Sequence, residues 1–129
     1  MKIVDLGSEV TQANMISPAA VTSSAALGSS LDLQGYQGKV RITLNIGAVT
    51  GTTPTLDIKV QDSADNSSFA DVSPAVAFAQ KVTASANTND SIVVDTRAVR
   101  RYIKLYGTAG GTTPSFTISA LAIGQKQTI

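Results

Sequence analysis

Hydrophobic and polar residues alternate strictly in two segments near the middle of the chain. Every second residue of 39–46 is Val, Ile or Leu, and residues 55–61 repeat the pattern. Alternation with a period of two gives a strand one face toward a core and one toward water, as in antiparallel sheets. The intervening residues 47–54 are rich in Gly and Thr and form a predicted loop. We therefore predict two strands here.

Shorter apolar segments indicate further strands. The additional predicted strands are 69–72, 75–82, 91–95, 102–106 and 116–123. The segments between them are rich in Gly, Asn, Asp and Pro, which end strands and form turns. Seven or eight short strands in a chain of 129 residues predict an all-β fold, an antiparallel β-sandwich with jelly-roll topology. A chain of this length forms one domain.

Residues 1–18 lack the clear alternation of the later segments. They are mildly amphipathic up to Ile16, and a Ser-Pro step then interrupts the pattern. We therefore predict an extended N-terminal arm over 1–18 and a single β-sandwich domain over 19–129, whose first strand is 19–27. Two interpretations of the arm stay open. It becomes ordered against a partner or a neighbouring subunit, or it is an edge strand packed on its own domain.

A five-residue segment occurs twice in the chain. Residues 51–55, Gly-Thr-Thr-Pro-Thr, recur as Gly-Thr-Thr-Pro-Ser at 111–115, and apolar residues with strand alternation follow each copy. Two such short copies are too few for a repeat protein. We predict two equivalent hairpins at one end of the sandwich, which arise either from duplication or from convergent loop chemistry.

The chain contains no histidine and no cysteine. The absence of histidine excludes Ser-His-Asp and Cys-His nucleophiles and histidine metal sites. The absence of cysteine excludes disulfides and thiolate zinc sites. The nine acidic residues include one glutamate, Glu9, and no pattern marks the facing carboxylate pair that a glycosidase needs. We therefore expect a protein that is not an enzyme and uses no cofactor or metal.

Charge and hydropathy give no sign of a nucleic-acid or membrane partner. The formal net charge is only +1, whereas nucleic-acid and membrane-surface binders carry strongly basic patches. No window approaches the roughly 18 apolar residues that a membrane helix needs. The first nine residues contain two acidic side chains and no continuous apolar run, so we do not expect a secretory signal.

Residues 62–68, Asp-Ser-Ala-Asp-Asn-Ser-Ser, carry oxygen-bearing side chains that suit either a calcium loop or a tight turn. The glycine at the sixth position and the closing glutamate of an EF-hand loop are both missing. We therefore favour an Asx-type turn, followed by Phe69 as an anchor in the core.

Four of the ten basic residues lie within positions 97–104, interleaved with tyrosine. On a strand, Arg100, Tyr102, Lys104 and Tyr106 share one face. In order of preference, this face is a solvated strand surface, a protein interface, for which Tyr and Arg are enriched, or a nucleic-acid platform. The candidate protein interface consists of Ile3, Val4, Leu6, Val10, Met15 and Ile16 in the arm, with Arg100, Tyr102, Lys104 and Tyr106.

The order of these segments resembles a group of tailed-bacteriophage virion proteins. Residues 39–45, 56–63 and 65–72 follow the group's pattern of strand, turn, aromatic residue and strand. Residues 95–105, which lead into a Gly-Thr loop and a last apolar strand, are similar too. Over roughly residues 31–123 the chain resembles small phage head decoration (cement) proteins with a jelly-roll fold. Asn66 stands where the turn more often carries glycine.

The resemblance implies a structural virion protein, made in the host cytoplasm and located on the outer capsid surface. Such a protein binds the major capsid protein, often as a homotrimer at local threefold positions, and stabilises the shell by bridging capsid subunits. The resemblance implies no catalytic residues. The alternative is a receptor- or carbohydrate-binding β-sandwich of a phage tail or fibre, although the chain has no Trp and only three Tyr for stacking on sugars.

Overall fold

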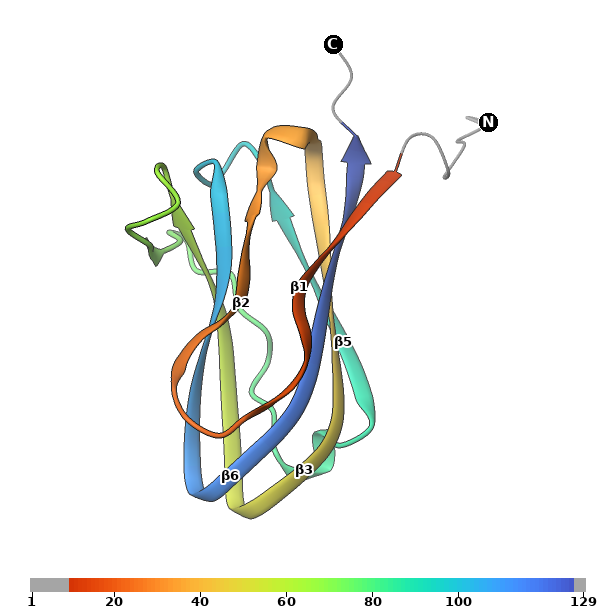
Figure 1. Cartoon of the computed structure of the whole chain (residues 1–129), viewed down its shortest axis with the longest axis vertical. Helices are drawn as coiled ribbons and strands as arrows, with labels where there is room; N and C mark the ends of the chain where they lie inside the picture. Colours follow the sequence, from red (N-terminus) through yellow and green to blue (C-terminus); the bar gives the residue numbers. More distant parts are fainter. Residues whose placement is uncertain (1–9, 127–129) are drawn as a thin grey trace.

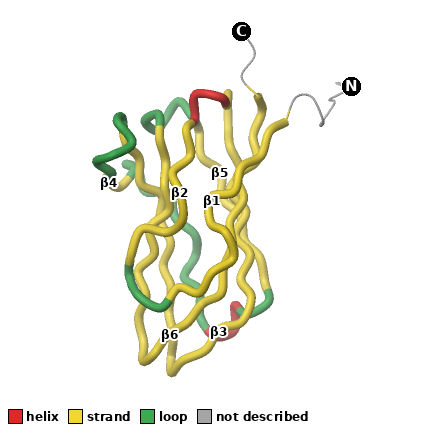
Figure 2. The backbone as a smooth tube through the Cα atoms, viewed as in Figure 1, coloured by secondary structure: helices red, strands yellow, loops and turns green. Residues whose placement is uncertain are grey.

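The structure, a computed structural model, describes residues 10–126 and consists mainly of long antiparallel strands (Figure 1). The strands are β1 (Val10–Val21), β2 (Ala25–Asp32), β3 (Tyr36–Ser63), β4 (Ala70–Asp71), β5 (Thr88–Asp95) and β6 (Tyr102–Lys126). Two short 3-10 helices, η1 (Leu33–Gly35) and η2 (Thr83–Ser85), lie at connections between strands (Figure 2). Within the described range no helix is long and apolar enough to cross a membrane.

A two-stranded ribbon of β3 and β6 forms the middle of the molecule. The two strands have 28 and 25 residues, and they pair from Tyr36 opposite Lys126 to Ser63 opposite Tyr102. Both strands turn back at the same end of the molecule, at the bottom of Figure 1. Three register shifts in the ribbon lie between Ile46 and Thr55 of β3. Bulges of this kind allow a strand to pass from one sheet into another.

The folded ribbon contributes to two packed layers. In the first layer the order is β1, the second half of β6, the first half of β3, and β5. In the second layer the order is β2, the first half of β6, the second half of β3, and an irregular edge over residues 70–82. This strand order is that of a jelly roll. The structure therefore confirms the predicted all-β antiparallel sandwich.

The core lies between the two layers and is built from the apolar positions of the alternating segments. The inward-facing side chains of the ribbon that are at most 3% exposed are Val40, Ile42, Leu44, Ile46, Leu56, Ile58, Val60, Ile103, Leu105, Phe116, Ile118, Ala120 and Ala122. Burial of one large aliphatic or aromatic side chain contributes about 1.5–3 kcal/mol. This set also fixes the strand register, because a slip by one residue would turn every member outward.

The repeated Gly-Thr-Thr-Pro segments lie opposite each other where the ribbon folds. A Cβ atom on Gly51 would lie 2.7 Å from the carbonyl oxygen of Thr113, and one on Gly111 would lie 2.5 Å from that of Thr53. Both glycines have positive φ angles, 115° and 96°, and the two threonines have φ of 44° and 46°. The copies are equivalent corners, each joining the two layers within one strand, and the prediction of two hairpins is wrong.

Several predicted strands merge or divide in the structure. The strands predicted at 39–46 and 55–61 are the two halves of β3, and those predicted at 102–106 and 116–123 are the two halves of β6. The strand predicted at 19–27 contains the turn between β1 and β2 instead. Local alternation locates each straight part of a strand, but it does not show that a strand continues through a bulged corner.

Residues 75–82 form an irregular edge in place of the predicted regular strand. Isolated bridges join Ala77 and Lys81 to β3, and Phe78 donates its backbone N–H to the carbonyl of Ile58 at 2.9 Å. An edge segment pairs on one side only, so its backbone can leave the ladder while Phe78 still packs into the core. The alternation of apolar residues in 75–82 therefore reflects the burial of side chains such as Phe78, and it does not require continuous hydrogen-bonded pairing with β3.

β1 begins inside the segment predicted as an N-terminal arm. Its register with β6 runs from Val10 opposite Gln125 to Val21 opposite Phe116. Of the two interpretations of the arm, the structure supports the second for residues 10–18, which form an edge strand packed on their own domain. Two register shifts on either side of Ile16 explain why no period-two pattern is visible there, since each bulge inverts the alternation. Residues 1–9 lie outside the described part of the chain.

The role of the corners can be tested by adding one methyl group. Gly51→Ala and Gly111→Ala should each lower the free energy of unfolding by about 1–3 kcal/mol, because positive φ and the opposite backbone both disfavour a Cβ atom. Urea denaturation measures the change. Gly35→Ala is the control, because a Cβ there meets no atom within 4 Å, and it should shift stability by less than about 0.5 kcal/mol. Equal effects at the three positions would contradict the role assigned to the corners.

Candidate functional site

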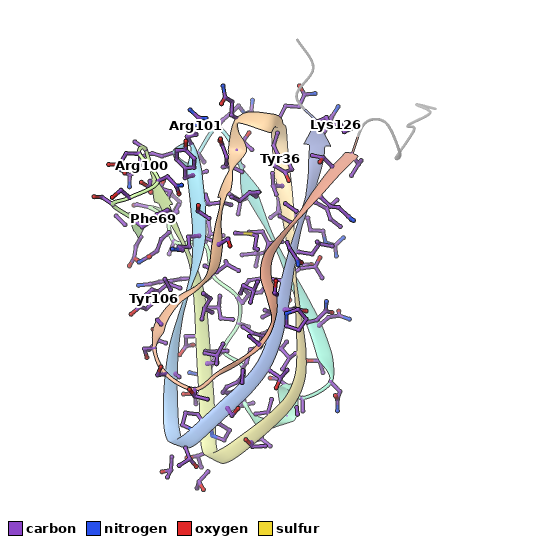
Figure 3. All side chains as sticks on the ribbon, in the orientation of Figure 1. Tyr36, Phe69, Arg100, Arg101, Tyr106 and Lys126 are labelled. Carbon is purple, nitrogen blue, oxygen red and sulfur yellow. The ribbon has the colours of Figure 1, made fainter. Side chains whose placement is uncertain are left out.

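The outer face of the second layer carries aromatic and cationic side chains. On β6, Tyr102, Lys104 and Tyr106 alternate with the buried Ile103 and Leu105, so they point away from the core. The structure thus brings together three of the four residues that the sequence places on one strand face. Tyr106 and Phe69 lie on the same side of the molecule in Figure 3.

Cations lie over the aromatic rings of this surface. The Nζ atom of Lys59 is 5.4 Å from the centroid of the Tyr106 ring. The Nζ atom of Lys104 is 5.3 Å from the centroid of the Phe69 ring. A cation within about 6 Å of a ring centroid is attracted by the ring quadrupole. We call the surface formed by these residues and one further tyrosine the aromatic face: Lys59, Phe69, Tyr102, Lys104 and Tyr106.

Two members of the aromatic face were not predicted as site residues. Lys59 lies on the polar side of its alternating segment and meets Tyr106 because β3 and β6 pair at that position. Phe69 was predicted as a core anchor, and this prediction is wrong, since the ring is partly exposed and covers Lys104. Neither contact has a local sequence signal, because both depend on pairing between distant segments.

An ion pair holds Lys59 in place beside Tyr106. The Nζ atom of Lys59 lies 2.9 Å from Oδ2 of Asp71, and the Gln61 side-chain amide donates to Oδ1 of Asp71 at 3.0 Å. The hydrogen bond from Gln61, together with that from Lys59, holds the pKa of Asp71 below its ordinary value. Exposed ion pairs stabilise folding by at most about 1 kcal/mol, so the main effect of this contact is to orient the ammonium group.

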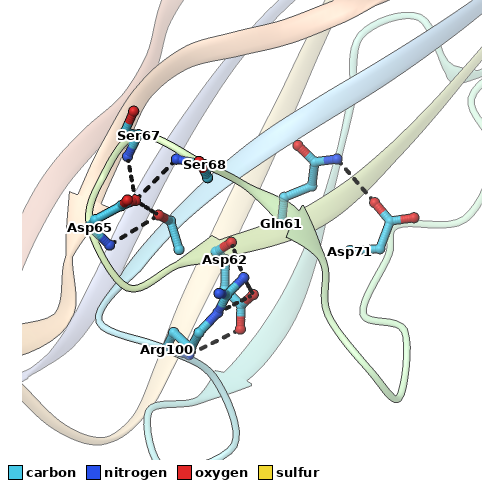
Figure 4. Close-up of polar contacts among 8 residues, drawn as sticks. Gln61, Asp62, Asp65, Ser67, Ser68, Asp71 and Arg100 are labelled. Atoms are coloured by element: carbon cyan, nitrogen blue, oxygen red, sulfur yellow. Dashed lines mark hydrogen bonds and ion pairs between the residues drawn. The ribbon is translucent and has the colours of Figure 1, made fainter.

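Arg100 lies outside the aromatic face, and its predicted position there is corrected. β6 begins at Tyr102, and Arg100 lies in the preceding loop, where Nε and Nη2 donate to Oδ1 of Asp62 at 3.1 and 2.9 Å (Figure 4). Its backbone N–H donates to Oδ2 at 3.0 Å. Asp62 is 8% exposed. Burial raises the pKa of Asp62, but the hydrogen bonds from Arg100 outweigh this effect, so the pKa lies below its ordinary value.

The turn at residues 62–68 is the predicted Asx-type turn. Oδ1 of Asp65 accepts hydrogen bonds from the backbone N–H groups of Ser67 and Ser68, each at 3.0 Å, and from the hydroxyl of Ser63 at 2.8 Å (Figure 4). The bond from Ser68 and those from Ser63 and Ser67 lower the pKa of Asp65 to about 2. Its oxygen therefore closes the turn that delivers Phe69 to the aromatic face.

Arg101 fixes the position of Tyr102 at one end of the aromatic face. Its guanidinium makes two hydrogen bonds of 2.9 Å to the carboxylate of Asp32 and lies 5.0 Å from the centroid of the Tyr102 ring. The bidentate geometry is the strong form of an Arg–carboxylate pair. The hydrogen bond from Arg101 lowers the pKa of Asp32 below its ordinary value.

The candidate residues of the N-terminal segment have other positions. Met15 and Ile16 are only 2% and 4% exposed and belong to the core, so their assignment to a free interface is corrected. A bulge in β1 between Asn14 and Ile16 allows two consecutive side chains to be buried. Val10 is half-buried at the start of β1. Ile3, Val4 and Leu6 lie outside the described residues.

A shallow depression of about 500 Å³ lies at the end of the sandwich away from the corners. Leu33, Tyr36 and Val99 provide apolar lining, and Arg97 and Arg101 provide charge. Each of these arginines already forms an ion pair within the chain, with Asp95 and Asp32 respectively. Burial raises the pKa of the Tyr36 hydroxyl. We assign no ligand to this depression.

The similarity of this chain to known proteins lies in the fold and not in the sequence. No protein-family model matches it, and no curated protein is significantly similar in sequence. The crystal structure of the SPBc2 prophage-derived protein YomS aligns with a TM-score of 0.50 at 13% identity, over 89% of this chain and 93% of that one. The two proteins share a fold along nearly their full lengths.

Two other solved structures are similar. A chain in the structure of infectious bursal disease virus, Gx strain, aligns with a TM-score of 0.52 at 14% identity, covering 88% of this chain. This chain spans 31% of that longer chain. A structure of Bacillus endospore appendages, described as disulfide-linked pili, aligns with a TM-score of 0.40, a level of similarity from which neither fold nor function follows.

Removal of the Arg100 side chain should destabilise the protein. Arg100→Ala leaves Oδ1 of the nearly buried Asp62 without its cation, while the backbone N–H at position 100 still donates to Oδ2. The loss of a hydrogen-bond partner by a buried polar atom costs about 1–3 kcal/mol. Urea denaturation measures this change. Arg97→Ala is the control, because Arg97 is 82% exposed and its loss should change stability by less than about 0.5 kcal/mol. Equal effects of the two substitutions would show that Arg100 has no such structural role.

The Asx turn should make stability sensitive to acid. Because folding lowers the pKa of Asp65 from 3.8 to about 2, its stabilising effect is complete above pH 3.8 and is lost as the pH falls through about 2. Asp65→Asn keeps an acceptor oxygen but does not titrate. The free energy of unfolding should therefore fall less steeply with acidification in the variant, as measured by urea denaturation at several pH values. Superimposable pH profiles would rule out this role of Asp65.

Proposed function

We propose that this chain is a structural protein of a tailed-bacteriophage virion that binds the outside of the capsid and bridges capsid subunits. The main supporting observation is the jelly-roll fold shared with a prophage-derived protein over 89% of this chain and 93% of that one. The proposed partner is the major capsid protein, with no direct contact to nucleic acid or membrane. The proposed role requires no enzymatic activity and no cofactor.

The aromatic face has the properties of a protein-binding surface. Tyrosine and phenylalanine rings provide a large contact area with few rotatable bonds, so little side-chain entropy is lost on binding. Here the rings are also held by neighbours, since Lys59 lies over Tyr106 and Arg101 lies over Tyr102. A surface that is already ordered before binding loses less conformational entropy on association.

The charge of the aromatic face indicates the chemistry of its partner. Lys59 is paired with Asp71, and Arg101 is paired with Asp32. Lys104 forms no ion pair within residues 10–126, and its ammonium lies over Phe69 at the surface. We therefore propose that the capsid surface presents a carboxylate to Lys104, with apolar groups that cover Tyr102 and Tyr106.

Shell stabilisation follows from interface energy multiplied over many copies. A stable contact buries roughly 1,200–2,000 Å² in total. When one decoration protein contacts two capsid subunits, separating those subunits must also break this contact. Many copies on a symmetric lattice add to the resistance of the shell, because each bridge acts in parallel and rebinding is local.

The direct test is binding to undecorated, expanded capsid shells of the phage that carries the gene. Wild-type protein should co-sediment with the shells and appear as regular density in electron micrographs. Tyr106→Ala and Lys104→Glu should each weaken binding by about tenfold or more, since each removes a central anchor of the interface.

The control for the charge reversal is Lys126→Glu, which makes the same change on β6 at its far end, in the other layer of the sandwich. This variant should bind shells like the wild type. Failure of the wild-type protein to decorate shells would overturn the proposal. Selective binding to a glycan array, lost in Tyr106→Ala, would instead support the receptor- or carbohydrate-binding alternative.

A further inference from the structure

Three of the four lateral edges of the sandwich are irregular. β1 contains two register shifts against β6 and a proline, Pro18. β2 has a register shift between Leu27 and Leu31. The edge at residues 70–82 has only the two-residue β4 and isolated bridges. Bulges, prolines and short strands are the usual devices that prevent a sheet edge from pairing with another chain.

β5 has no bulge, no proline and a full eight residues, and its charged side chains are Asp90, which is paired with Lys81 on the inner side, and Asp95. Its eight residues pair with β3 in one unbroken register, from Lys39 opposite Asp95 to Ile46 opposite Thr88. The strand contains no proline and no lysine. Among residues 10–126 no other strand pairs with its outer side, and Figure 1 shows β5 at the lateral edge of its layer. A regular, uncovered edge of this length is a template for an added strand.

Val93 gives this edge an exposed apolar side chain. It is 53% exposed, the most exposed large hydrophobic residue of the described chain. It lies opposite Arg41 on the outer face of the first layer, while its neighbours Ile92 and Val94 point inward with Ile42 and Val40. The core therefore does not account for a valine at position 93.

We infer that two copies of this chain pair antiparallel through their β5 edges, about a twofold axis at Val93. When two copies of a strand pair antiparallel about a twofold axis at one residue, a residue that lies n positions before that residue in one copy faces the residue n positions after it in the other copy. With Val93 at the centre, Val93 faces Val93 of the second copy, and Ile92 faces Val94. The two first layers then form one continuous sheet across the dimer.

The charges along β5 fit this register. Asp95 of one copy lies opposite Ser91 of the other, so no two carboxylates face each other across the seam. Nη2 of Arg41 donates to the Ser91 hydroxyl at 3.0 Å, which places a guanidinium beside the incoming Asp95. Both hydrogen bonds that Asp95 accepts from Arg97 go to Oδ1, so Oδ2 is the oxygen for a donor of the second copy. The twofold axis repeats this contact twice.

Registers centred on a neighbouring residue fit less well. A twofold at Ile92 places Asp90 opposite Val94, and it places Val93 opposite Ser91 rather than against another apolar side chain. The carboxylate of Asp90 is already held by Lys81 at 2.6 Å, on the inner side of the strand. Apolar cross-strand pairs are the favourable ones in an antiparallel sheet, so Val93 is the preferred centre.

The inferred dimer is independent of capsid binding, because the aromatic face lies on the other layer and stays uncovered. It also differs from the threefold assembly that the resemblance to cement proteins implies. An isologous edge-to-edge contact closes after two copies. The assembly state in solution therefore distinguishes the two arrangements directly.

The first experiment measures the assembly state. Sedimentation equilibrium of the wild-type protein over a concentration series should show a monomer–dimer equilibrium. Val93→Lys should weaken dimerisation by about tenfold or more, because it removes the central apolar pair and places two like charges opposite each other. Gln12→Lys, on the exposed side of the β1 edge of the same layer, is the matched control and should dimerise like the wild type. Circular dichroism checks that both variants are folded.

The second experiment tests the register by cross-linking. The chain has no cysteine of its own, so a single introduced thiol gives an unambiguous product. Val93→Cys should form a disulfide-linked dimer under mild oxidation, since directly opposite residues of an antiparallel pair are within disulfide distance. Ser91→Cys is the control on the same face, and it should cross-link poorly, because its counterpart in the second copy lies four residues away along the seam.

Three results would overturn the inference. They are a wild-type protein that stays monomeric at the highest concentration reached, an oligomer that persists unchanged in Val93→Lys, and equal cross-linking of Val93→Cys and Ser91→Cys. A trimer that tolerates the lysine would point to the threefold arrangement instead. None of these results bears on capsid binding through the aromatic face, so the two proposals fail separately.

Discussion

The pairing of β3 with β6 is the interaction on which the rest of this structure depends. The two strands run side by side from Tyr36 and Lys126 to Ser63 and Tyr102, and the ribbon they form is bent once. Because each strand has one half in each layer, the ribbon forms the two middle strands of both layers and thereby most of the core. The other strands add to its margins, β1 and β2 along β6, and β4 and β5 along β3.

The bend itself depends on close backbone contact between two copies of one short sequence. Gly51 and Gly111 each lie against the backbone of the opposite copy, at positive φ, where a side chain would collide with a carbonyl oxygen. This arrangement explains why the same residues recur. Both corners need a glycine at positive φ against the backbone of the opposite strand, because the two strands of one ribbon bend at the same place. Duplication is not needed to account for the repeat.

The ribbon also determines what surfaces the molecule presents. On the second layer it places Lys59 of β3 beside Tyr106 of β6, and the Asx turn that follows β3 delivers Phe69 over Lys104. On the first layer it leaves β5 as an unbroken edge with Val93 exposed. One surface carries ordered aromatic rings and the other is a regular strand edge with an exposed valine, and the two lie on different layers of one fold.

The sequence by itself determined the straight parts of the strands, the inner faces of the core and the Asx turn, because alternation and turn chemistry act over a few residues. Only the tertiary structure decided that Arg100 binds Asp62 instead of joining the aromatic face, that Met15 and Ile16 are buried together at a bulge, and which sheet edge stays unpaired among residues 10–126. These features depend on which distant segments pair. Many pairings satisfy the same local alternation, and only packing of the whole core selects one of them.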